Sequence, residues 1–177
     1  MRTITMLGLL LVPALSASAQ SRGTEVAVKI STLGFSSSSG TNLTTAGLGN
    51  GGGVGLGLFL SPEMAIEPSV NFSYLHSGGE STTAAELGLS LPIYLEKTWG
   101  HSGMYFAPGA RFRSVSYSGE SAQSQFALGG EVGSKVKIAD PVSLRLGVMA
   151  TNWFKTSDTA AEFGLTAFFG VSVFLKK

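Results

Sequence analysis

Hydrophobic and polar residues alternate along most of this chain, and the alternation is clearest between residues 162 and 175. In this stretch every second residue from Phe163 to Leu175 is apolar, whereas the residues between them are mostly small or polar. Because successive side chains of a β-strand point to opposite faces, the pattern predicts a strand with one apolar and one mixed face. The stretch is longer than the roughly 9–11 residues that a tilted strand needs to cross the hydrocarbon of a bilayer.

The same alternation recurs in seven earlier segments, which are separated by residues typical of turns. The eight predicted strands cover residues 24–35, 51–60, 64–76, 84–95, 103–117, 125–138, 142–154 and 162–175. The connections after the odd-numbered strands are rich in Ser, Thr and Gly (36–50, 77–83, 118–124 and 155–160), and two of the others are short and contain proline. This regularity predicts an antiparallel up-and-down meander with two different ends.

The residues opposite the apolar faces decide between a soluble and a membrane barrel. In a soluble barrel they would meet water, and a water-facing surface needs about 25–35% charged residues. Here only 13% of all residues are charged, and the face in question is mostly Gly, Ser and Thr. In a membrane barrel the apolar face meets lipid, and an interior of eight strands is just wide enough to be filled by side chains. The sequence therefore predicts an all-β fold, an eight-stranded antiparallel up-and-down transmembrane β-barrel.

The first residues have the features of a secretory signal peptide. Arg2 supplies the positive charge, residues 6–15 form a short apolar core, and Ala17 and Ala19 fit the small-x-small cleavage pattern. The apolar core is too short to span a bilayer as a helix. We therefore predict that the signal peptide is cleaved before Gln20.

These boundaries divide the chain into a signal peptide, residues 1–19, and one barrel domain, residues 20–177. The chain has no Cys, which excludes disulfides, cysteine metal sites and lipid attachment through cysteine. Without Arg2 the basic and acidic residues are equal in number, 11 of each, so no basic surplus points to a nucleic acid as partner.

In layout, residues 24–175 resemble the small eight-stranded outer-membrane barrels of bacteria, the group of the OmpA transmembrane domain and OmpX. Members of this group end on a signal that the barrel-assembly machinery reads: a polar residue, a Gly two positions on, and two hydrophobic residues at alternate positions near the terminus. Gly170, Val173 and Leu175 occupy these positions, whereas Phe168 stands where a polar residue is usual.

The resemblance implies a location in the outer membrane, reached by export through the inner membrane. Both termini would then be periplasmic, and the longer connections would face outside the cell. The expected partners are outer-membrane lipid and, during biogenesis, periplasmic chaperones and the assembly machinery. We expect the barrel to be a monomer.

Charged residues on the predicted inner face are the candidate functional residues. They are Lys29, Glu67, Arg111, Glu131, Lys135 and Arg145. Four of them fall near the same end of their strands, whereas Arg111 and Glu131 lie higher, on adjacent strands. Because buried charges persist only when they are paired and hydrogen-bonded, we predict a lumenal salt-bridge network. In this network Glu67 lies among the cations, and Arg111 contacts Glu131.

Aromatic residues gather near both ends of the predicted strands, as the two interfacial girdles of a membrane barrel do. The predicted girdles are Tyr74, Tyr117, Phe126, Trp153, Phe154 and Phe163 at one end, and Tyr94, Trp99, Tyr105, Phe106 and Phe174 at the other. A few aromatics have the phase of the inner face: Phe35, Phe59 and Tyr105. Prolines within strands mark candidate β-bulges: Pro68, Pro92 and Pro108.

Catalytic, cofactor and metal motifs find no support in the sequence. Residues 47–52 match G-x-G-x-x-G, but a dinucleotide site requires a helix after it, and here an alternating strand follows. His76 and His101 each precede a Ser, but neighbours in a strand point to opposite faces, and the two histidines belong to opposite ends of the barrel. No cluster of residues suggests a metal site.

We therefore predict an outer-membrane barrel with a side-chain-filled polar lumen and a structural or surface-interaction role, not an enzyme. One alternative is a narrow transporter for small or hydrophobic solutes, which a lateral opening or a continuous lumen would indicate. The other is a barrel enzyme that modifies lipid A, which an assay for deacylation or acyl transfer on membrane lipids would reveal.

Overall fold

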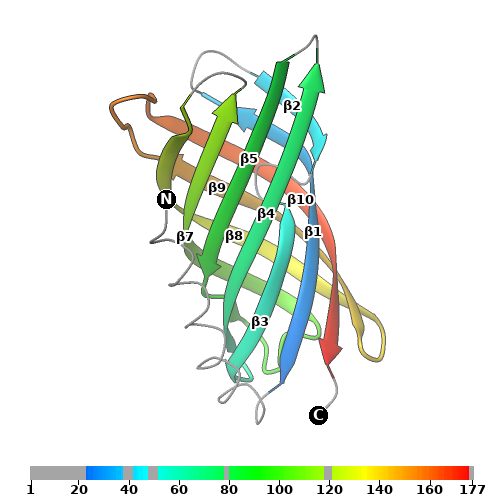
Figure 1. Cartoon of the computed structure of the whole chain (residues 1–177). Coiled ribbons are helices and arrows are strands. Elements are labelled where there is room, and N and C mark those ends of the chain that lie inside the picture. Colours follow the sequence, from blue (N-terminus) through cyan, green and yellow to red (C-terminus); the bar gives the residue numbers. More distant parts are fainter. Residues whose placement is uncertain (1–22, 38–41, 48–51, 78–79, 118–120, 176–177) are drawn as a thin grey trace, which may run out of the picture.

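In a computed structural model of the chain, the described residues form a closed antiparallel β-barrel (Figure 1). The structure describes residues 23–37, 42–47, 52–77, 80–117 and 121–175. The predicted signal peptide, with Ala17, Ala19 and Gln20, lies outside the described residues. Among those that are described, no helix is both long and apolar enough to cross a bilayer.

Ten strands fill eight positions in the barrel wall. They are β1 (Thr24–Ser36), β2 (Asn42–Gly47), β3 (Gly53–Ser61), β4 (Met64–Ser77), β5 (Glu80–Ser90), β6 (Ile93–Tyr94), β7 (Gly103–Tyr117), β8 (Gln123–Ala139), β9 (Val142–Trp153) and β10 (Glu162–Leu175). β2 and β3 pair with the two halves of β1, and β5 and β6 pair with β7 in one register. β10 pairs with β1 and closes the sheet, so the predicted eight-stranded barrel is confirmed.

The barrel has two different ends, as the spacing of the connections predicts. One end, which we call the turn end, holds the β3–β4 and β8–β9 turns, the segment 95–102, the start of β1 and the end of β10 (Figure 1). The β9–β10 connection, the ends of β4 and β7 and the starts of β5 and β8 lie at the other end, which we call the loop end (Figure 1). Strands β4, β7, β8, β9 and β10 therefore run between the turn end and the loop end.

Apolar side chains cover the outside of the barrel, as predicted. On β10 the exposed set is Phe163, Leu165, Phe169, Val171, Val173 and Leu175, and the buried set between them includes Thr166, Phe168, Ser172 and Phe174. Exposed Leu, Val, Ile and Phe side chains continue the set around the other strands. A belt of this size would aggregate in water, whereas it matches the lipid-facing band of a membrane barrel.

Strand β2 extends the wall where the polar residues predict only a connection. Its residues Asn42–Gly47 pair with the loop-end half of β1, from Ser36 to Ser31. Without this strand the backbone N–H and C=O groups on that edge of β1 would lack partners, which lipid does not tolerate. The pattern of side chains gives no sign of β2, because its Ser- and Thr-rich surroundings do not alternate.

A β-bulge reverses the predicted phase of Phe35. The register between β1 and β10 shifts between Ser31 and Leu33, and one extra residue moves every later side chain to the opposite face. Phe35 pairs with the outward-facing Leu165 and is 38% exposed. The prediction that Phe35 faces inward is therefore wrong, whereas Phe59 is buried in the lumen as expected.

The three strand prolines do not mark bulges. The register is the same on both sides of Pro68 in the β4–β5 pair and of Pro108 in the β7–β8 pair. Pro92 separates β5 from β6 without shifting their common register with β7. Proline lacks a backbone N–H and so removes one hydrogen bond between strands, but this loss does not require an inserted residue. The other register shifts lie between Phe59 and Ser61 and between Lys137 and Ala139.

The predicted aromatic girdles are only partly correct. At the loop end the exposed aromatics are Tyr74, Tyr117, Phe126, Phe154 and Phe163, but Trp153 is buried. At the turn end Trp99 and Phe106 are exposed, whereas Tyr94, Tyr105 and Phe174 point into the lumen. The buried rings share the inward phase of their strands, so they fill the interior and do not contact the membrane interface.

Placing a charge on the outer belt tests its contact with lipid. Leu146→Arg, near the middle of β9, should lower the free energy of unfolding by about 2–4 kcal/mol, whereas Leu95→Arg at the turn end should cost about 0–1 kcal/mol, because the cost of a charge depends on its depth. Guanidinium titrations of the barrel in lipid vesicles measure both values. Equal losses in the two variants would contradict the position of the belt.

Candidate functional site: the charged lumen

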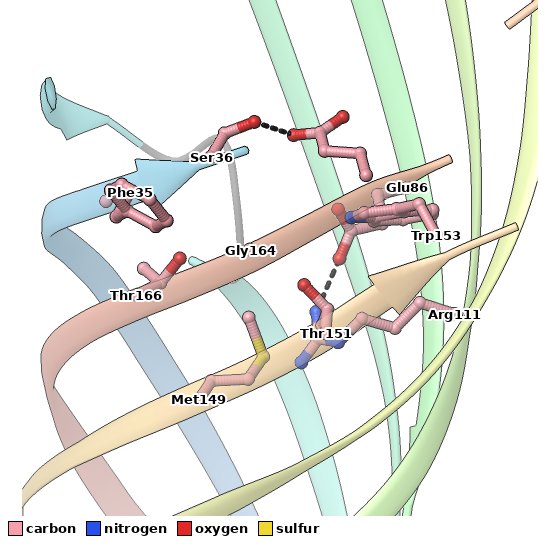
Figure 2. A pocket seen from close by; sticks show the side chains of 11 residues that line it. Phe35, Ser36, Glu86, Arg111, Met149, Thr151, Trp153, Gly164 and Thr166 are labelled. Atoms are coloured by element: carbon pink, nitrogen blue, oxygen red, sulfur yellow. Dashed lines mark hydrogen bonds and ion pairs between the residues drawn. The ribbon is translucent and has the colours of Figure 1, made fainter. Parts of the chain in front are cut away.

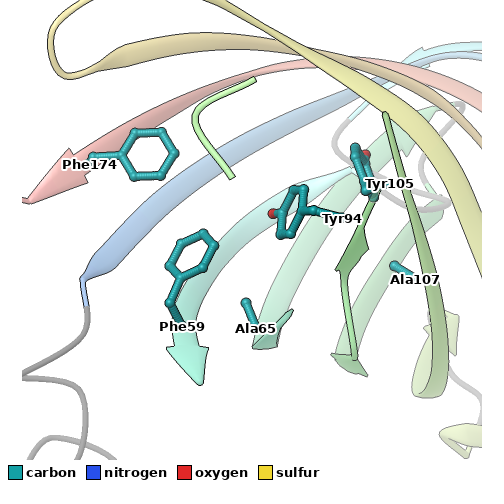
Figure 3. Close-up of a cluster of buried hydrophobic side chains, with 6 residues drawn as sticks. All are labelled: Phe59, Ala65, Tyr94, Tyr105, Ala107 and Phe174. Carbon is teal, nitrogen blue, oxygen red and sulfur yellow. The ribbon is translucent and has the colours of Figure 1, made fainter. Parts of the chain in front are cut away.

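Aromatic rings fill the lumen at the turn end (Figure 3). Phe59 packs against Tyr94 and Phe174 with ring centroids 5.8 Å and 6.1 Å away, and Tyr94 lies 5.6 Å from Tyr105. Ala65 and Ala107 complete this group of six residues, which we call the aromatic plug. The plug closes the turn end of the barrel.

The segment 95–102 packs against the plug from the turn end. Gly100 has a φ of +70°, and a Cβ atom there would lie 2.5 Å from Cζ of Phe59, so this close approach requires glycine. The ring of His101 stacks on Phe174 at 3.8 Å. Burial lowers the pKa of His101, and the positive charge of Lys137 acts in the same direction, so the imidazole is neutral at pH 7.

Four buried ions form a closed ring in the middle of the lumen. Arg145 on β9 contacts Glu67 on β4 at 2.5 Å and Glu131 on β8 at 2.7 Å. Lys29 on β1 contacts the same two carboxylates at 2.7 Å and 3.1 Å. Tyr105 from the plug donates to Glu131 and accepts a hydrogen bond from Nε of Arg145 at 2.7 Å. We call these four ions the central ring. It joins four strands, β1, β4, β8 and β9.

A third buried cation, Lys135, lies between the central ring and the plug. Lys135 Nζ donates to both carboxylate oxygens of Glu25 at 2.6 Å and to the hydroxyl of Tyr94 at 2.8 Å. The Lys135 and Glu25 side chains are 0% and 1% exposed. An ammonium removed from water this completely requires a full set of acceptors, and these two residues supply it.

Two further ion pairs occupy the loop-end half of the lumen. Arg111 on β7 pairs with Glu86 on β5 (Figure 2). Arg113 pairs with Glu162 at 2.5 Å, donates to Gln125, and stacks its guanidinium over Trp153 at 4.1 Å. Glu162 also accepts a hydrogen bond from Ser36, so this group links β1, β7, β8 and β10 near the loop end.

The structure thus brings Lys29, Glu67, Glu131 and Arg145 into direct contact, places Lys135 next to them, and leaves Arg111 apart. The predicted contact of Arg111 with Glu131 is wrong. In the β7–β8 register Arg111 faces Ala127, and Glu131 faces Ala107, four residues closer to the turn end. Glu131 is bound by the central ring, and Arg111 finds its partner on β5.

Charges of the two signs balance inside the barrel. The paired cations are Lys29, Arg111, Arg113, Lys135 and Arg145, and the paired carboxylates are Glu25, Glu67, Glu86, Glu131 and Glu162, five of each. Sequence reasoning left out Glu25, Glu86, Arg113 and Glu162. All four alternate with outward-facing apolar residues, so the period of two could have identified them as inward-facing.

Inward glycines make room for these side chains. A Cβ atom at Gly55 would lie 3.2 Å from Cγ of Glu67, and one at Gly57 would lie 3.2 Å from Cβ of Glu25. Both glycines lie on β3, so this strand presents almost no side-chain volume to the charges beside it. The glycine-rich inner face is therefore a packing requirement of the ion pairs.

Within the part of the chain that the structure describes, two small cavities remain in the lumen. A cavity of about 20 Å³ lies beside Arg111, Met149 and Trp153 (Figure 2), and another of about 10 Å³ lies between Ser69 and Glu131. A single water needs about 10–15 Å³ measured in this way. These cavities hold a water molecule or two and do not form a channel. Among the described residues no group of three or more His, Cys, Asp or Glu could hold a metal ion.

The predicted assembly signal lies on β10. Gly170 faces the lumen and pairs with Lys29 and Arg145 on the neighbouring strands. Val173 and Leu175 are 38% and 51% exposed on the outer face. The reading of these residues by an assembly machinery stays a prediction.

Comparison with known proteins gives a family and a fold. A family model described as outer membrane protein beta-barrel domain matches residues 7–173. The structure is similar to Neisserial surface protein A, with 16% identity, 85% of this chain and 96% of that chain covered, and a TM-score of 0.63. It is also similar to Ail, the attachment invasion locus protein of Yersinia pestis, with 10% identity, 86% of this chain and 98% of that chain covered, and a TM-score of 0.56. No curated protein matches the sequence.

Removing one member of the central ring tests its contribution to stability. Arg145→Met should lower the free energy of unfolding by about 3–5 kcal/mol, because Glu67 and Glu131 lose a buried partner. Adding Glu67→Gln should recover part of this loss, since one fewer carboxylate is left without its cation. Denaturant titration of the barrel in lipid vesicles measures both changes.

The matched control is Lys97→Met, which removes an exposed ion pair with Glu63 at 3.4 Å and should cost about 0–1 kcal/mol. A loss for Arg145→Met no larger than that of the control would contradict a stabilising ring.

Proposed function

The chain belongs to the outer membrane protein beta-barrel domain family, and from this premise we propose that it is a closed outer-membrane barrel with a structural or surface-interaction role. The filled lumen carries the proposal. The plug occupies the turn end, the central ring spans the middle, and the Arg113 group lies near the loop end. An ion would have to displace all three layers to pass.

The balance of charges supports the same conclusion. A pore that selects ions by charged side chains presents a ring of one sign to its permeating ions. Here each lumenal cation contacts a carboxylate, and the total charge of the ten paired residues is zero. Such an interior is suited to holding the wall together, because the described lumenal charges already bind one another.

A closed lumen leaves the outer surface and the connections as the parts that can act. Ail, whose name refers to attachment, has the same fold, so a barrel of this shape can present an attachment surface. For this chain we propose that the loop end is the outward-facing surface and that the protein is not an enzyme.

Two further proposals concern biogenesis. We propose that residues 1–19 direct export and are removed before Gln20, and that Gly170, Val173 and Leu175 are read by the assembly machinery. The barrel would enter the outer membrane with the turn end in the periplasm and remain a monomer there.

Conductance in planar bilayers tests the closed lumen. The folded barrel should show no stable ion-selective openings, because the cavities beside Arg111 and Glu131 hold a water molecule or two at most. Glu67→Gln and Glu63→Gln form a matched pair, since one residue is in the central ring and the other is at an exposed turn. Openings whose selectivity changes with Glu67→Gln but not with Glu63→Gln would show a pore and contradict the proposal.

A further inference from the structure

The outer wall contains an apolar hollow that is separate from the lumenal cavities. It has a volume of about 580 Å³ and lies over β4, β5, β7 and β8. The apolar side chains that line it are Ile66, Leu89, Leu91, Pro108, Ala110 and Leu128. Binding pockets for small ligands measure about 300–1,000 Å³, so the hollow is large enough for part of a ligand.

Small outward-facing residues create the hollow. Ala110 lies between Leu89 and Leu128, its partners in the two neighbouring strands, which are 55% and 50% exposed. Large apolar residues occupy most other outward positions of the belt, and lipid would accept one at position 110 as well. The floor is thin because it is made by Ser90, Gly109 and Gly129, which are paired side by side across the wall.

The hollow lies at mid-height in the lipid-facing belt. On the loop-end side it is bounded by Phe112 and Phe126, which are paired and both exposed. On the turn-end side the next outward pair on the same strands is Phe106 and Val132, also exposed. Apolar side chains therefore border the hollow at both ends along β7 and β8, and none of the lining residues is charged.

We propose that this hollow binds one acyl chain of a membrane lipid. Its surface is continuous with the belt that the lipid already covers, so an acyl chain is what meets it in the membrane. A flexible hydrocarbon chain can follow the groove between Leu89 and Leu128. Each methylene group transferred from water contributes about 0.8 kcal/mol. An acyl chain in the bilayer has already gained this energy, so only better packing in the hollow favours the bound acyl chain over its neighbours.

Native mass spectrometry tests the site. The barrel is refolded in vesicles of dimyristoylphosphatidylcholine, extracted into detergent, and released from the micelle in the spectrometer. The wild-type barrel should retain one phospholipid. Ala110→Phe fills the hollow and should lose it, whereas Ala85→Phe should retain it, because Ala85 is an exposed residue of the same wall outside the hollow. A shift in gel mobility on boiling shows that each variant has folded.

Three outcomes would overturn the proposal. The first is equal retention of phospholipid by Ala110→Phe and the wild type, or no retention by either. The second is a barrel dimer that Ala110→Phe alone abolishes, which would assign the hollow to a second copy of the chain. The third is loss of retention when dimyristoylphosphatidylglycerol replaces the first lipid, because a site for the chain does not depend on the headgroup. None of these outcomes depends on whether the lumen conducts ions.

Discussion

Backbone hydrogen bonding in lipid is the constraint on which this structure depends. Lipid offers no partner for an N–H or C=O group, so a sheet in the membrane must close on itself. The pairing of β1 with β10 achieves this closure. The same constraint accounts for β2, which pairs with the part of β1 that β3 does not reach, and it explains why Pro92 interrupts a strand without displacing its neighbours.

Closure with eight strand positions leaves a narrow interior, and that narrowness determines its chemistry. Side chains from opposite walls meet across the lumen, so Arg145 reaches Glu67 over a separation of 78 residues in the sequence. Buried ions must be paired, which explains why Lys29 and Arg145 share the same two carboxylates. Glycines such as Gly55 provide the necessary room. Tight packing and charge neutrality are thus two consequences of one geometry.

The sequence predicts the barrel, the number of strand positions and the side that faces lipid, because all three follow from a period of two. It does not predict details that depend on register. Phe35 faces outward because of a bulge at Ser31 that leaves no trace in the pattern. Arg111 binds Glu86 and not Glu131, because in the β7–β8 register Glu131 faces Ala107, four residues closer to the turn end. The alternation places Glu25 on the same inner face as Lys29. Its pairing with Lys135, 110 residues away, becomes evident only in the closed barrel.

Site-directed spin labelling of β10 tests the orientation of the wall most directly. The chain has no Cys, so each variant carries a single label, introduced in turn at positions from Leu165 to Phe174. In lipid vesicles, labels at Leu165, Phe169, Val171 and Val173 should collide frequently with dissolved oxygen, and labels at Thr166, Phe168, Ser172 and Phe174 should be shielded and immobile. A reversed alternation, or uniform accessibility along the strand, would contradict a barrel with its apolar side chains in lipid and its ion pairs inside.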